Sequence, residues 1–286
     1  MYKDKFNNSI PTMNYLDKIN ASAKYLRERT KYQPAIGMIL GSGLGSMANQ
    51  IENPDKIAYE DIPNFPVSTV AGHNGQLVIG TLYGKTVIAM QGRVHLYEGV
   101  TMQELTFPVR VMQRLGVQML IVTNACGGLN PDFYAGGLMF IQDHLNLMGD
   151  NPLIGKNFEE LGPRFPDMSA AYDPALLAHG QACAKELGIE TFEGIYSAIS
   201  GPYYLGKAEL RMLTTLGADT VGMSTIPETI VAVHGGMKVL GISCITDMAV
   251  PDDLQPLTHE HVVEIAAKVR PKFIRLVSRI IEKITL

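Results

Sequence analysis

The chain has 286 residues, of which 46% are hydrophobic and 18% are charged, so the sequence excludes a globally disordered protein. The formal net charge is -4 and no basic stripe is present, which disfavours a general nucleic-acid binder but leaves a small anionic ligand open. The three cysteines form no CxxC pair, which argues against a disulfide framework or zinc ribbon and indicates a reducing, cytoplasmic location. No apolar run reaches the roughly 18 residues of a membrane span, so we expect no membrane partner.

Residues 1–15 are expected to form a flexible N-terminal tail that precedes one domain at 16–286. Leu16, Ile19 and Leu26 have the spacing of an amphipathic helix, which we expect over 15–30. The apolar run at 35–40 then predicts a buried parallel strand that stops at glycines. Further strands are expected at 76–81, 85–90, 119–123, 138–142, 193–197, 220–223 and 239–246. Further helices are expected at 102–114, 174–187, 207–215, 227–234 and 259–284.

This alternation of strands and helices predicts βαβ units and a mostly parallel or mixed sheet. No linker rich in proline, glycine or serine separates two halves of the chain, and no internal repeat is found. The sequence therefore favours a single α/β domain.

The first candidate site is Gly-Ser-Gly-Leu-Gly at 41–45, directly after the first strand. Glycine lets the backbone approach an anion closely, and Ser42 adds a hydroxyl donor. The spacing matches neither the dinucleotide motif nor the Walker motif. A phosphate loop and a tight structural turn both remain open here.

The second candidate is the segment 91–99, which follows the strand at 85–90. In an extended chain, Arg93, His95 and Tyr97 would share one face, because side chains alternate with a period of two. A guanidinium and an imidazole aimed at one point suit an oxyanion. The alternative is an edge strand with ordinary polar side chains, but the carboxyl end of a strand favours a ligand site.

Three further strand ends carry small or polar residues. At 123–130 a ligand could lie against Ala125, although the segment taken alone favours a tight turn into a helix, with Cys126 as a small packed residue. At 221–228 Ser224 offers a hydroxyl, and Glu228 suits the first turn of a helix. Asp247 ends the last strand, where it is either a cap or a ligand contact.

Taken together, these segments resemble the trimeric purine nucleoside phosphorylases over nearly the whole chain. The resemblance rests on six motifs in family order, at 41–45, 71–73 (Ala-Gly-His), 92–99 (Gly-Arg-Val-His-Leu-Tyr-Glu-Gly), 123–130 (Thr-Asn-Ala-Cys-Gly-Gly-Leu-Asn), 164–169 (Arg-Phe-Pro-Asp-Met-Ser) and 222–228 (Gly-Met-Ser-Thr-Ile-Pro-Glu). It implies a single α/β domain whose mixed sheet partly closes into a barrel flanked by helices. It also implies a homotrimer that splits nucleosides with phosphate into free base and pentose 1-phosphate, without a metal or other cofactor.

The same resemblance assigns roles to individual residues. The implied phosphate site comprises Ser42, His73, Arg93, His95, Ala125 and Ser224. The implied sugar site comprises Tyr97, Met223, His259 and, from a neighbouring subunit, Phe165. The implied base site comprises Tyr204, Leu205, Val221 and Asp247, and the catalytic roles fall on His95 and Asp247.

Two positions of the base site differ from the family pattern. Leu205 stands where the family usually has a Glu that accepts a hydrogen bond from the base, and a leucine side chain cannot accept one. Asp247 stands where the family usually has Asn, and an ionised Asp would repel a 6-oxo group but accept from a 6-amino group. We therefore expect a preference shifted towards 6-aminopurines.

Two alternatives follow from these differences. The related 5′-methylthioadenosine phosphorylases also carry Asp at this position and lack the Glu, but they have a small apolar residue where His259 stands. The other alternative is a catalytically weak purine-binding member of the family, since the usual base contacts are lost.

Overall fold

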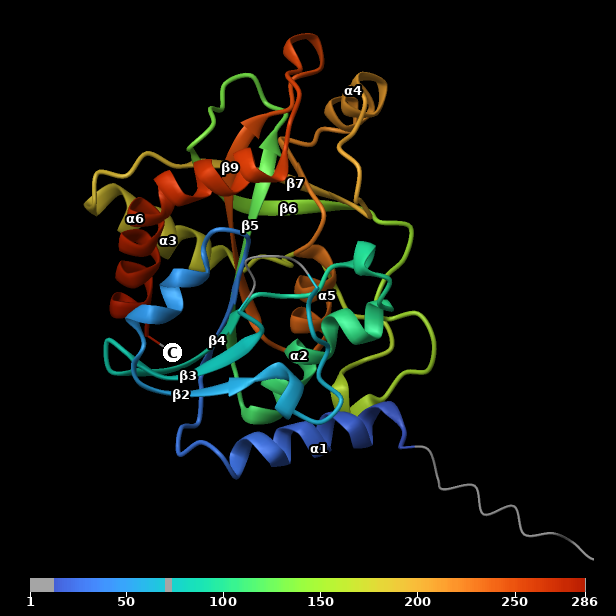
Figure 1. The fold of residues 1–286 in the computed structure, drawn as a ribbon, viewed down its shortest axis with the longest axis vertical. Coiled ribbons are helices and arrows are strands. Elements are labelled where there is room, and N and C mark those ends of the chain that lie inside the picture. Colours follow the sequence, from blue (N-terminus) through green and yellow to red (C-terminus); the bar gives the residue numbers. More distant parts are fainter. Residues whose placement is uncertain (1–12, 70–73, 286) are drawn as a thin grey trace, which may run out of the picture.

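The strands of the chain form one mixed sheet in the computed structural model, which describes residues 13–69 and 74–285 (Figure 1). The expected tail at 1–15 lies mostly outside the described residues. Its last residue, Tyr15, already begins helix α1 (Tyr15–Arg27), where the side chain of Asn14 accepts a hydrogen bond from the backbone of Asp17.

The strands of the described ranges are β1 (Ile36–Leu40), β2 (Glu52–Ala58), β3 (Gln76–Leu82), β4 (Lys85–Gln91), β5 (Met119–Gly128), β6 (Leu138–Leu147), β7 (Phe192–Ile199), β8 (Thr220–Gly222) and β9 (Lys238–Met248). Their order in the sheet is β2-β3-β4-β1-β5-β8-β7-β6-β9, and β5 also pairs with β9. The strands β5, β8, β7, β6 and β9 thus close on themselves. The expected mixed sheet, partly closed into a barrel, is confirmed.

Helices cover the two faces of the sheet (Figure 1). The remaining helices are α2 (Met102–Leu115), α3 (Pro174–Glu186), α4 (Lys207–Thr215), α5 (Ile226–His234) and α6 (His259–Lys283). In chain order they match the expected helices, with ends that differ by at most one residue. α1, α2 and α5 pack together over one face, whereas α3 and α6 pack over the other.

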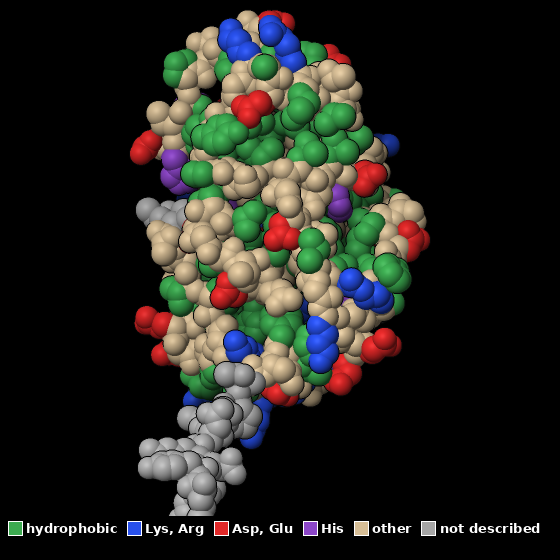
Figure 2. All heavy atoms as spheres, turned by 90° about the vertical axis from the view of Figure 1, so that its right-hand side faces the viewer, with side chains coloured by type: hydrophobic (Ala, Val, Ile, Leu, Met, Phe, Trp, Pro, Cys, Tyr) green, Lys and Arg blue, Asp and Glu red, His purple; other side chains and the backbone are tan. Residues whose placement is uncertain are grey.

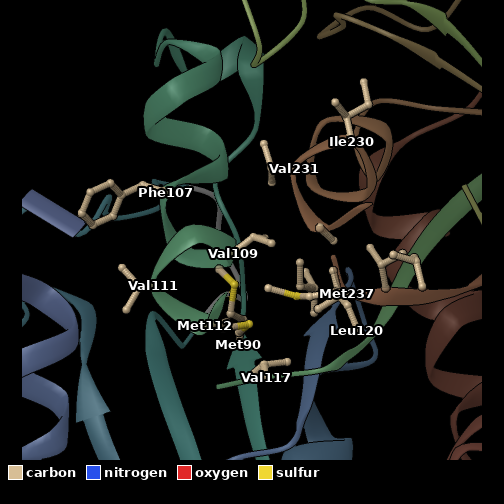
Figure 3. Packing of buried hydrophobic residues seen from close by; sticks show 14 of the residues in the cluster. Met90, Phe107, Val109, Val111, Met112, Val117, Leu120, Ile230, Val231 and Met237 are labelled. Atoms are coloured by element: carbon tan, nitrogen blue, oxygen red, sulfur yellow. The ribbon is translucent and has the colours of Figure 1, made fainter. Parts of the chain in front are cut away.

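The alternation of side chains along β1 explains these two layers. Met38 and Leu40 are buried in the layer that contains Phe273 of α6, whereas Ile39 is buried in the layer of α1, α2 and α5. Figure 3 shows part of this layer of α1, α2 and α5, where Met112 of α2 and Leu120 of β5 both approach Gly37 of β1: a Cβ on Gly37 would lie 3.1 Å from Sδ of Met112 and 3.1 Å from Cδ1 of Leu120. The sheet is therefore hydrophobic on both faces, as a sheet covered by helices must be.

Two features of the sheet differ from expectation. Strand β2 was not expected, because most of its side chains are exposed and it lies at the edge of the sheet. Strand β5 continues to Gly128, so the tight turn favoured at 123–130 is wrong. The extended chain fits there because Gly128 lies tightly against β9: a Cβ on it would be 2.8 Å from Sδ of Met248.

Candidate active site

A cavity of about 780 Å³ lies at the carboxyl ends of several strands, where α/β proteins usually bind ligands. It gathers most of the residues that the sequence marks for a site: Ser42, Arg93, His95, Tyr97, Ala125, Tyr204, Leu205, Val221, Met223, Ser224, Asp247 and His259. Phe165 does not line this cavity, and its side chain is 88% exposed. His73 lies outside the described residues.

The glycine segment 41–45 brings Ser42 to the cavity wall. A Cβ on Gly41 would lie 2.8 Å from Cα of Asn124 and 2.8 Å from the carbonyl oxygen of Thr123, so only glycine lets the loop pack against β5. The backbone N–H of Gly41 also donates to Oγ1 of Thr123 at 3.1 Å. The segment leads into a short 3₁₀ helix (Gly45–Gln50) rather than an α-helix.

The Arg93 guanidinium is buried and held from two sides. Its Nη1 lies 3.0 Å from Oε1 of Glu228, and its Nη2 donates to the carbonyl oxygen of Thr123 at 2.7 Å. Arg93 is 3% exposed and Glu228 is 2% exposed, so each charge compensates the other in the interior. Sequence reasoning gave Glu228 only a place in the first turn of α5. Glu228 and Arg93 lie 135 residues apart in the sequence, so no local pattern indicates this ion pair.

The expectation that Arg93, His95 and Tyr97 share one strand face is wrong. The chain leaves the strand at Gln91, and Leu96–Glu98 form a 3₁₀ turn. The rings of His95 and Tyr97 stack instead, with centroids 4.8 Å apart and planes 10° from parallel. All three side chains still line the cavity, because the turn redirects Tyr97 towards it.

Glu98, which sequence reasoning did not single out, orients His95. Its Oε1 accepts from the backbone N–H of His95 at 2.7 Å and lies 3.3 Å from Nδ1 of the ring, while its Oε2 accepts from the backbone N–H of Thr69 at 2.6 Å. Burial alone would raise the pKa of Glu98, but the hydrogen bonds from His95 and Thr69 outweigh it and lower the pKa to about 2. Burial lowers the pKa of His95, against the opposing effect of Glu98. A neutral His95 whose Nδ1–H donates a hydrogen bond to Glu98 presents Nε2 as an acceptor.

The opposite end of the cavity is apolar. Leu205, Leu210, Val221 and Leu254 line it and belong to one hydrophobic cluster with Ala249. Figure 2 shows hydrophobic side chains gathered over the upper part of one face of the molecule, on the side where α4 lies in Figure 1. In the segment around α4, the exposed large hydrophobic residues are Tyr203, Tyr204, Met212 and Leu216.

Asp247 places a carboxyl group at this apolar end. It lies inside β9, where its Oδ1 accepts from Oγ1 of Thr246 at 3.0 Å. A Cβ on Gly127 would lie 3.1 Å from Oδ2 of Asp247, so the glycine makes room for the carboxyl group. Burial raises the pKa of Asp247, although the hydrogen bond from Thr246 opposes this effect. Asp247 therefore does not cap the strand, and its side chain lines the cavity.

His261 is a cavity residue that sequence reasoning missed. It lines the wall with His259 in the first turn of α6, and its backbone N–H donates to Oγ1 of Thr258, the N-cap. The N-cap itself was a usable signal, because it places residues 259–261 at the helix start.

Over 13–69 and 74–285, no cluster of three or more His, Cys, Asp or Glu side chains is arranged to hold a metal ion. Within the same ranges, no helix combines the length and apolar character needed to cross a bilayer.

The chain is similar to known proteins over most of its length. The family model of the phosphorylase superfamily matches residues 35–282. Purine nucleoside phosphorylase 1 of Bacillus subtilis is 56% identical over 93% of this chain and 98% of its own, and the enzyme of Rattus norvegicus is 46% identical over 92% and 93%.

Solved structures are also similar to this chain. Isoform 2 of the Schistosoma mansoni purine nucleoside phosphorylase, in complex with cytosine and ribose-1-phosphate, has a TM-score of 0.91 and 41% identity, and covers 94% of this chain and 97% of its own. A Schistosoma mansoni purine nucleoside phosphorylase in complex with adenosine has a TM-score of 0.90 and 40% identity, over 95% of this chain and 98% of its own. The chain therefore belongs to the phosphorylase superfamily and, within it, to the purine nucleoside phosphorylases.

Proposed function

We propose that this protein splits purine nucleosides with inorganic phosphate, releasing the free base and pentose 1-phosphate. The observation that carries the proposal is a single cavity with two different ends. One end holds the buried Arg93 and the hydroxyl groups of Ser42 and Ser224, and the other has an apolar wall with Asp247. Structures of similar Schistosoma mansoni enzymes in complex with inosine and with ribose-1-phosphate support it.

The anion end would hold phosphate. The proposed contacts are Ser42, Arg93, His95, Ser224, the backbone amide of Ala125 and His73. Breaking the glycosidic bond builds positive charge on the sugar ring, as in glycoside cleavage. A phosphate held beneath the ring stabilises this charge and attacks C1′. Neutral His95 can take a proton from the phosphate, which increases the negative charge that faces the ring.

The sugar would lie over the phosphate, against Tyr97 and Met223, with His259 at its 5′-hydroxyl. We further propose that Phe165 completes this site in a neighbouring copy, which makes the working enzyme a homotrimer. The 88% exposure of Phe165 on its own chain supports this assignment.

The base would stack on Tyr204, with Leu205 and Val221 against its faces and edge. The leaving base gains negative charge and needs a proton or hydrogen bond near N7. With its raised pKa, Asp247 can supply that proton, and in its ionised form it accepts from a 6-amino group. Leu205 cannot accept a hydrogen bond from the base, so Asp247 is the polar group that distinguishes one base from another. We therefore propose a preference for 6-aminopurine nucleosides.

Phosphate is proposed as the only co-substrate, with no metal or further cofactor, in a cytoplasmic enzyme without nucleic-acid or membrane partners. The domain is proposed to span 16–286 behind a short tail.

A panel of inosine, guanosine, adenosine and 5′-methylthioadenosine, each with and without phosphate, tests the proposal. We expect adenosine to release adenine in the presence of phosphate with the highest kcat/KM of the four nucleosides. Strong inosine turnover without adenosine turnover would refute the base preference alone. A large preference for methylthioadenosine, which Leu205 and Asp247 would allow, would identify a methylthioadenosine phosphorylase. Ligand binding without any turnover would identify a purine-binding protein. Gel filtration tests the trimer, which should have a mass of about 94 kDa, three times 31.3 kDa.

A further inference from the structure

Thr225, which directly follows the cavity residue Ser224, has a strained backbone. Its φ is 76° and its ψ is -49°, and the N–H of Ile226 donates to the carbonyl oxygen of Ser224 at 2.8 Å across it. These values define a γ-turn of the rare form, with a β-branched residue at the centre, where glycine would be free of strain. A fully buried residue keeps such a conformation only where its surroundings enforce it.

The turn joins two parts of the anion end. Ser224 before it lines the cavity, and α5 begins immediately after it, with the backbone N–H of Thr229 donating to the carbonyl oxygen of Thr225 at 2.9 Å. The first turn of that helix carries Glu228, which holds Arg93. A single residue therefore sets the Ser224 hydroxyl relative to the helix that orients the guanidinium.

A chain of hydrogen bonds runs through the Thr225 side chain. The Asn124 amide donates from Nδ2 to Oγ1 of Thr225 at 3.0 Å, and this oxygen lies 3.2 Å from Oγ of Ser224. An amide nitrogen can only donate, so the Thr225 hydroxyl accepts from Asn124. Its own proton can then be donated to Ser224, which leaves the Ser224 proton for a ligand. Successive donors polarise one another when buried, and all three residues are buried.

We propose that Thr225 is a positioning residue of the anion site, which receives a hydrogen bond from Asn124 and fixes the Ser224 hydroxyl as a donor to the phosphate. This inference rests on the proposed function, in which Ser224 binds phosphate. The strained turn is the backbone geometry that brings the two hydroxyl groups together.

The test compares Thr225→Val, which removes the hydroxyl and keeps the branched shape, with Thr225→Ser, which keeps the hydroxyl. We expect Thr225→Val to raise KM for phosphate about tenfold, the change expected for one lost hydrogen bond, with KM for the nucleoside unchanged. Thr225→Ser should restore the wild-type KM for phosphate. Thr229→Val is the matched control: it makes the same change one turn further along the chain, inside α5, at a buried position that does not line the cavity.

The Ser224→Ala background separates a relay from a general defect. If Thr225 acts through Ser224, adding Thr225→Val to Ser224→Ala should change KM for phosphate less than twofold. Additive effects, or equal rises in both KM values, would overturn the proposal. Thr225→Gly accepts the positive φ and serves where Thr225→Val does not fold; it too should raise only KM for phosphate.

Calorimetric titration with inorganic phosphate distinguishes the two levels of failure. A wild-type protein that binds phosphate without turnover would refute the proposed reaction. The role of Thr225 would then be tested by the Kd for phosphate, which should be about tenfold higher for Thr225→Val than for Thr225→Ser. Equal Kd values for Thr225→Val and Thr225→Ser, or no phosphate binding by the wild type, would overturn the relay.

Discussion

The two ends of the cavity are built differently. At the anion end, Arg93, Ser224 and Glu228 are buried, and the Arg93 guanidinium is bonded to β5 and to the first turn of α5. At the apolar end, Leu205 is half-buried and Tyr204 is 46% exposed. The end proposed to hold the reacting phosphate is thus fixed by the core, whereas the end proposed to select the base is made largely from segments near the surface.

This difference teaches where substitutions are tolerated. A change at Leu205 replaces one contact on a partly exposed segment, whereas a change at Arg93 or Glu228 leaves a buried charge without its partner. Both departures from the family pattern, Leu205 and Asp247, lie at the apolar end. Specificity can therefore diverge while the phosphate chemistry is retained.

The largest effect is expected from Arg93→Ala at the anion end. Removing the buried guanidinium takes away a charged donor that faces the transition state, so kcat/KM should fall about a thousandfold for every nucleoside. Initial rates across the substrate panel measure this. Lys207→Ala, an exposed change beside the apolar end, is the control and should alter the rate less than twofold. An Arg93→Ala enzyme within tenfold of wild type would contradict the difference between the two ends.

Glu228→Ala tests the same end through stability. It leaves the Arg93 charge buried without its carboxylate, so the free energy of unfolding should fall by about 3 to 5 kcal/mol. Urea titration measures the loss. The double variant Arg93→Ala with Glu228→Ala should be more stable than Glu228→Ala alone, yet remain inactive. A Glu228→Ala protein with wild-type stability would show that the ion pair is dispensable.

Asp247→Asn tests the apolar end. The amide can donate to a 6-oxo group, so the ratio of kcat/KM for inosine to that for adenosine should rise about ten- to a hundredfold. KM for phosphate should stay at its wild-type value. Adding Leu205→Glu should raise the ratio further. An unchanged ratio would mean that Asp247 does not read position 6 of the base.

The smallest effect is expected from Glu98→Gln, which concerns acid stability near the anion end. The pKa of Glu98 is lowered to about 2 in the folded protein, so its carboxylate contributes stability above its ordinary pKa of 4.5 and loses that contribution as the pH falls towards 2. The difference in unfolding free energy between wild type and Glu98→Gln, about 1 kcal/mol above pH 4.5, should therefore shrink as the solution is acidified. A difference that grows on acidification would refute this assignment.

The sequence predicted the buried strands and the long helices because their hydrophobic periods and caps are local. It missed β2, because most side chains of that strand are exposed. It ended β5 early, because small residues such as Gly127 and Gly128 are typical of turns and only their packing against β9 shows that the strand continues. Most of the candidate site residues line one cavity, as expected from strand ends that meet at one edge of the sheet. The partner of Arg93 could not be predicted, since charge pairing across the fold leaves no local pattern.

The ion pair between Arg93 and Glu228 joins segments 135 residues apart in the chain. Contacts of such long range require a long loop to close, which costs conformational entropy. The anion end is thus complete only when α5 has docked on the sheet, and a partly folded chain has no binding site for phosphate. Since phosphate would then bind the native state alone, the concentration of substrate would itself raise the thermal midpoint of the enzyme.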